Sequence, residues 1–177
     1  MLFRSKAAAE AADAVLTGAG VAPGSRVAIT SGSRGIAGIA AITRAVVDRV
    51  RERGHRPVIV PAMGSHGGAT AAGQRAILAH YGVTEESMGC PIDGAMDVVS
   101  LGVTRDGVDV FMARAAWDAD RVLVLNRVKP HTDFHGQRES GIAKMAVIGL
   151  GKLEGAQACH RHVFGMGLGA EIGRAHV

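Results

Sequence analysis

The chain has 177 residues, enough for one domain with a substantial core. Its composition is 47% hydrophobic and 20% charged, which excludes a disordered protein. The net charge of +4 is scattered among acidic residues without a basic, aromatic-rich block, so we do not expect nucleic-acid binding. No apolar run reaches 18 residues, no signal-peptide pattern is present, and the two cysteines form no CxxC motif. We therefore expect a cytoplasmic protein with reduced thiols and no membrane span.

The first half of the chain alternates short buried strands with helices. Twenty-five glycines and only 3% aromatic residues favour an α/β protein over a β-sandwich. Thr70 follows a glycine-rich loop and is a suitable N-cap for the helix behind it. Hydrophobic spacing and turn residues predict helices at 5–16, 36–53 and 70–81, and strands at 26–30 and 57–61.

The second half of the chain has a different order of predicted elements. Residues 97–101 and 108–112 read as two strands joined by the turn 105–107, which predicts a β-hairpin. A short helix at 113–119, a strand at 121–126 and helices at 142–148 and 153–164 follow. The order predicts an α/β fold: a mainly parallel, Rossmann-like sheet with helices on both faces and a β-hairpin insert.

Polar residues follow three of the predicted parallel strands. Arg34 comes after the first strand, His66 after the second, and His131 after the strand at 121–126. Ligands of such sheets bind beyond the carboxyl ends of the strands. We therefore expect Arg34, His66 and His131 to lie at one edge of the sheet.

The loop TSGSRGIAG, residues 30–38, has the small residues of an anion-binding turn, with Arg34 able to hold a carboxylate or phosphate. It resembles the dinucleotide loop of short-chain dehydrogenases, but Ser31 and Ala37 replace required glycines. Tyr81 is followed four residues on by Glu85 rather than by the lysine of that family's catalytic pair. An NAD-linked oxidoreductase is therefore disfavoured, and a plain turn with a solvated Arg34 remains the alternative.

The role of each histidine can be interpreted in two ways. His66, among glycines, suits general acid/base work because its pKa lies near neutrality, but a turn histidine is the simpler reading. His131 and His135 have the spacing of a zinc pair on a helix, which the neighbouring Pro130 disfavours. His160 can bind metal or lie on a polar helix face.

Lys144 stands at a predicted helix start among apolar residues, where its pKa would fall and its nucleophilicity rise. The alternative is a lysine that extends from an amphipathic helix into solvent.

Together four motifs resemble the N-terminal domain of the nickel-dependent lactate racemases. They are GSHGG at 64–68, KPH at 129–131, SGIAK at 140–144, and a histidine sixteen residues after Lys144. The resemblance covers residues 27–164. It implies a racemase or epimerase of a small, lactate-like 2-hydroxy acid.

The resemblance also implies a nickel pincer nucleotide, a pyridinium mononucleotide whose two sulfur-bearing arms hold nickel through S, C and S. By motif position Lys144 would tether this cofactor and His160 would complete the nickel coordination. His66 and His131 would form the acid/base pair, and Arg34 would bind the substrate. Cofactor-synthesis enzymes are the implied partners.

Two departures from the family concern the substrate: Ser31 replaces an acid, and the segment between His131 and Lys144 is about three residues longer. We expect residues 1–170 to form the N-terminal domain, with a C-terminal domain missing, and residues 171–177, which match a translated sequencing adapter, to be a non-native tail. A non-catalytic module that binds an anionic nucleotide or organic acid is the alternative function.

Overall fold

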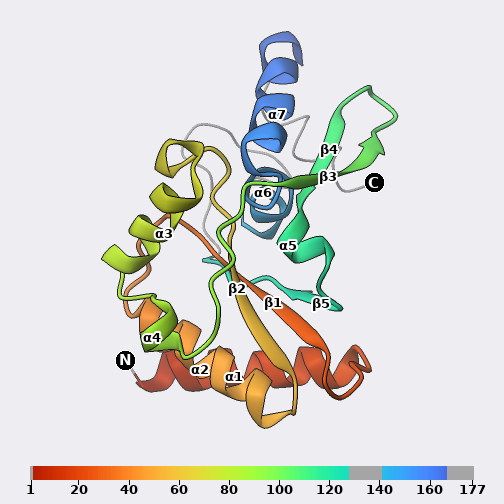
Figure 1. Ribbon diagram of the computed structural model, residues 1–177. Helices are drawn as coiled ribbons and strands as arrows, with labels where there is room; N and C mark the ends of the chain where they lie inside the picture. The colour runs from red at the N-terminus through yellow and green to blue at the C-terminus, as the bar shows by residue number, and fades with distance from the viewer. Residues whose placement is uncertain (1, 128–140, 167–177) are drawn as a thin grey trace.

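The computed structural model describes residues 2–127 and 141–166. In that part of the chain, strands and helices alternate as expected (Figure 1). The first half contains α1 (Leu2–Gly18), β1 (Arg26–Ser31), α2 (Ile39–Glu52), β2 (Arg56–Pro61), the 3-10 turn η1 (Gly67–Ala69), α3 (Ala71–His80) and α4 (Glu85–Met88). The second half contains β3 (Val98–Val103), β4 (Asp109–Ala113), α5 (Arg114–Trp117), β5 (Arg121–Leu123), α6 (Ile142–Lys144), the π-helical turn η2 (Met145–Gly149) and α7 (Lys152–Met166).

Three strands form a parallel sheet in the order β2-β1-β5. Arg26 of β1 pairs with Arg56 of β2, and Val27 pairs with Arg121 of β5. The outer edge of β2 is covered by the chain around Ile92, which forms a single parallel bridge to Ile59. The predicted α/β class and the parallel sheet are confirmed.

Alternate strand residues point to opposite sides of the sheet, and other elements cover both faces. Val27, Ile29 and Ile59 pack with apolar residues of α1 and α2. Ala28, Val58 and Val60 pack with α5 and the segment from η2 to α7. Each fully buried valine or isoleucine stabilises the fold by about 1.5–3 kcal/mol relative to an exposed one. Figure 1 shows α1 and α2 together beneath the strands, with α6 and α7 at the other end of the molecule.

The predicted hairpin is also confirmed, as β3 and β4 pair antiparallel with a register shift between Ser100 and Gly102. The hairpin is joined to the C-terminal helices through the backbone, because Ala113 donates a hydrogen bond of 2.6 Å to the carbonyl of Leu150. It therefore supports the segment that leads into α7.

Several element boundaries differ from the sequence prediction. Helix α2 begins at Ile39 rather than residue 36, because Gly38 has a left-handed φ of 76°. Strand β5 ends at Leu123, although Leu125 still donates to the Thr30 hydroxyl at 3.0 Å and so remains beside β1. The helix predicted at 142–148 is one turn of α6 followed by the π-helical turn η2. Thr70 is the N-cap of α3, as expected, and accepts a hydrogen bond from the backbone of Gly73.

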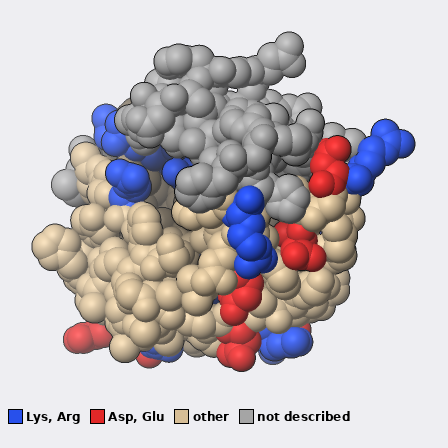
Figure 2. All heavy atoms as spheres, turned by 90° about the horizontal axis from the view of Figure 1, so that it is seen from above, with Lys and Arg blue, Asp and Glu red and all other residues tan. Residues whose placement is uncertain are grey.

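The molecule seen from above is shown in Figure 2. Its Lys and Arg side chains lie in separate groups on this face, with acidic side chains beside some of them. Among the residues that the structure describes, no helix combines the length and apolar character that crossing a bilayer requires.

Candidate functional site at the carboxyl ends of the strands

The loops that follow β1 and β2 meet in space. Ser33 Oγ and His66 Nδ1 share a hydrogen bond of 2.5 Å, although the residues are 33 positions apart. This contact places the first two predicted strand exits at one edge of the sheet. The third exit, with Lys129 and His131, lies outside the described residues, so the position of His131 stays a prediction.

The loop that carries His66 takes its shape from glycines. Gly64, with a φ of 59°, donates its N–H to the carbonyl of Gly149 in η2 at 3.2 Å. Gly67, with a φ of 68°, lies so close to α3 that an added Cβ would be 2.6 Å from the helix backbone. Only glycine tolerates both this backbone conformation and this approach. The loop is therefore fixed between α3 and η2.

His66 lies in a positive field. Although His66 is exposed, partial desolvation lowers the pKa of its imidazole. The positive charges of Arg34 and Lys144 lower the pKa further, so these two side chains act on His66 electrostatically. His66 is consequently neutral at neutral pH and able to accept a proton.

A hollow of about 660 Å³ opens beside this histidine. Its lining includes two further ring side chains, and the hydroxyl of Tyr81 donates to the Ser33 carbonyl at 3.1 Å. Tyr81 thus holds the loop that carries the hydrogen-bond partner of His66. The hollow, which we call the His66 hollow, is lined by Ser33, Ser65, His66, Gly67, Gly68, Ala76, Ile77, His80 and Tyr81.

The two residues assigned to the cofactor lie on successive helices. Lys144 is half-buried at the end of α6, three residues after Gly141, which precedes the helix with a φ of 82°. His160 is exposed on α7. No group of three or more metal-binding side chains occurs within residues 2–127 and 141–166. A pincer that supplies S, C and S itself needs only one protein ligand, and a primary amine and an exposed imidazole are the two groups that it would require.

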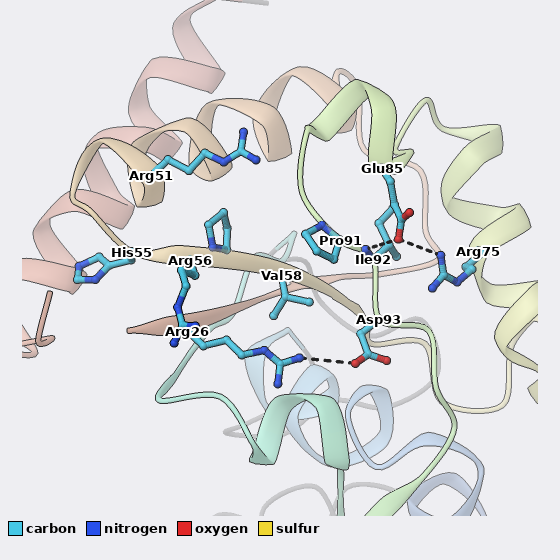
Figure 3. Close-up of a pocket in the computed structure, with 11 residues that line it drawn as sticks. Arg26, Arg51, His55, Arg56, Val58, Arg75, Glu85, Pro91, Ile92 and Asp93 are labelled. Atoms are coloured by element: carbon cyan, nitrogen blue, oxygen red, sulfur yellow. Dashed lines mark hydrogen bonds and ion pairs between the residues drawn. The ribbon is translucent and has the colours of Figure 1, made fainter. Parts of the chain in front are cut away.

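A second hollow, lined in part by residues at the starts of β1 and β2, shares no lining residue with the His66 hollow (Figure 3). Its charged side chains are largely paired with one another. Arg26 lies 3.6 Å from Asp93, and Arg75 lies 3.1 Å from Glu85. None of the site residues expected from the sequence lines this hollow.

Two buried polar residues behind the His66 loop were not predicted from the sequence. Gln74 and Lys152 are both fully buried. Gln74 has a sequence signal, since it precedes Leu78 by four residues on the inner face of α3, where an apolar residue is expected. Lys152 has no such signal, because a lysine after a glycine normally indicates a solvated helix start.

The fold and this site define an α/β domain whose polar loops meet at the carboxyl ends of parallel strands. The family model for the lactate racemase N-terminal domain matches residues 7–169, so the chain belongs to this family. No curated protein matches the chain significantly. This family is one of isomerases.

Proposed function

We propose that this chain is the N-terminal domain of a racemase or epimerase that acts on a small 2-hydroxy acid. The observation that carries the proposal is His66, which is held by Ser33 and whose pKa is lowered by partial desolvation and by the charges of Arg34 and Lys144. The family match supports the isomerase class. In this proposal residues 1–170 form the domain, and a further domain supplies the remaining substrate contacts.

The proposed cofactor is the nickel pincer nucleotide, which when bound supplies a reversible hydride acceptor. Lys144 would tether it covalently, and His160 would be the protein ligand of the nickel. Lys144, a half-buried residue with a primary amine, and His160, an exposed residue with an imidazole, are suited to these roles.

His66 would accept the proton of the substrate hydroxyl, and the hydride from carbon 2 would go to the acceptor that the bound cofactor supplies. The neutral imidazole that this step requires is favoured by the lowered pKa of His66. The Ser33 hydroxyl can donate to Nδ1 of the neutral ring or accept from Nδ1–H of the protonated ring, so it stabilises both states. We assign His131 the same task on the opposite side of the substrate, which serves the other enantiomer.

Arg34 binds the substrate carboxylate in this scheme. Its guanidinium presents a fork of N–H donors that matches a carboxylate, and its charge already acts on His66. A substrate with a carboxylate beside a hydroxyl-bearing carbon offers one group to Arg34 and the other to His66. This pairing favours a 2-hydroxy acid over a neutral alcohol.

The test is racemisation of a panel of 2-hydroxy acids by protein produced together with the cofactor-synthesis enzymes. We expect turnover with at least one lactate-like substrate, and its loss in both His66→Ala and His131→Ala. Variants that still melt at the wild-type temperature exclude a folding defect. Binding of organic acids without turnover by the cofactor-loaded wild type would instead establish a non-catalytic module.

A further inference from the structure

Lys152 is a fully buried lysine at the start of α7, with a left-handed φ of 55°. Its Nζ donates to the carbonyl of Pro61 at 2.8 Å and to Oε1 of Gln74 at 3.1 Å. No carboxylate of the described residues lies within ion-pair distance of it. Among the residues that the structure describes, the amine is therefore bound by neutral oxygens only.

Gln74 continues this network toward the His66 loop. Its Nε2 donates to the carbonyl of Gly64 at 2.9 Å and to the carbonyl of His66 at 3.4 Å. Because Lys152 occupies Oε1, the amide has one orientation, with its NH2 group toward the loop. The chain of contacts thus runs from the start of α7 through α3 to the backbone of His66 itself.

We propose that Lys152 and Gln74 are positioning residues that fix the His66 loop and so set the place of its imidazole in the site. The catalytic role of His66 in this proposal rests on the proposed function, whereas the hydrogen bonds of the network do not depend on it. Through it, the backbone position of His66 is tied to α7, which carries His160, and to the end of β2.

The energetics favour this role over simple packing. A buried lysine without a charged partner is costly, and an apolar side chain of similar volume would stabilise the core more. Desolvation lowers the pKa of Lys152 to about 8, which shows how strongly the amine is removed from water. A fully satisfied buried network does, however, restrict the backbone to one geometry. Loop precision is what such a costly residue provides.

Two variants separate positioning from stability. In Gln74→Glu one carboxylate oxygen still accepts from Lys152, whose ammonium keeps the carboxyl ionised. The other oxygen faces the carbonyls of Gly64 and His66 and repels them. In Lys152→Met the methionine fills the space, but the Gln74 amide loses its anchor. The matched controls are Gln157→Glu and Lys6→Met, at exposed positions on α7 and α1.

The experiment compares the imidazole NMR signals of His66 and the steady-state kinetics of the cofactor-loaded protein. We expect both variants to shift the His66 signals and to lower kcat by up to about 10²-fold, the cost of a displaced catalytic group. We expect little change in KM or in the mass of the Lys144 adduct, and no change in the controls.

Folded variants with wild-type His66 signals and wild-type kcat would overturn the proposal. Failure of both variants to fold would assign the pair to the core and would also overturn it. If the wild type shows no racemisation, the proposed function fails, yet the His66 signals still decide whether the network positions the loop.

Discussion

The buried amine of Lys152 makes the stability of this protein depend on pH in a specific window. In the folded state burial lowers the pKa of Lys152 from its ordinary 10.5 to about 8, with Asp93 opposing the shift through its charge. Between these pH values the unfolded chain binds a proton at this lysine and the folded chain does not. Stability therefore rises with pH between about 8 and 10.5.

The size of the effect follows from the two pKa values. At about 1.4 kcal/mol for each unit of pKa, the difference contributes at most about 3 kcal/mol across this window. Cys90 works in the opposite direction, because burial raises the pKa of its thiol and stability falls as the unfolded thiol ionises. The contribution of Lys152 must therefore be measured as a difference between variants.

The assay is urea denaturation of the wild type, Lys152→Met and Lys6→Met at several pH values from 7 to 10.5. We expect the free energy of unfolding of Lys152→Met to fall relative to wild type as the pH rises, by at most about 3 kcal/mol. Lys6 is exposed, so Lys6→Met should follow the wild-type curve. Parallel curves for wild type and Lys152→Met would show that burial does not lower the pKa of Lys152 in the folded protein.

Three further predictions concern the His66 loop and its surroundings. In Ser33→Ala, loss of the hydrogen bond to His66 should lower kcat about tenfold, the effect of roughly 1.4 kcal/mol, in steady-state assays. In Arg34→Gln, removal of a positive charge should raise the pKa of His66 in an NMR titration and move the acid limb of the pH–rate profile to higher pH. An unchanged pKa would show that the charge of Arg34 does not act on His66. Gly67→Ala should lower the free energy of unfolding by at least about 2 kcal/mol, because its Cβ meets the α3 backbone. Gly24 also has a left-handed φ, but an added Cβ would lie in open space, so Gly24→Ala should lower the free energy of unfolding by only about 1 kcal/mol in the same urea titration. Equal losses in the two variants would argue against a close approach of Gly67 to α3.

Much of the fold follows from local patterns in the sequence. The buried strands β1 and β2 are continuous apolar runs, as parallel strands covered on both faces must be. The Thr70 cap and the hairpin turn have local signals that tertiary packing did not override. The end of β5 was not predictable, because the apolar residues Val124 and Leu125 would fit equally well inside a strand. In the structure, the backbone N–H of Leu125 donates to the side chain of Thr30 instead of to a strand partner.

The part of the candidate site that could be predicted is the loops that follow β1 and β2, since a sequence motif marks each of them. Topology alone brings the exits of β1 and β2 together, and the Ser33–His66 contact confirms this for Arg34's loop and for His66. The residues behind the loop were not predictable. The side chain of Lys152 contacts Pro61, 91 positions away, and Gln74, 78 positions away. Only the tertiary fold, in which the start of α7 packs against β4 and η2, brings these residues together.

The proposed cofactor chemistry is tested by the intact mass and nickel content of the protein purified from cells that also produce the cofactor-synthesis enzymes. We expect a covalent adduct of the mass of the pincer nucleotide on Lys144, with bound nickel. The adduct should be absent in Lys144→Ala, and in His160→Ala it should persist while nickel is lost. An unmodified Lys144 together with absence of nickel in the wild type would show that this chain does not carry the pincer nucleotide.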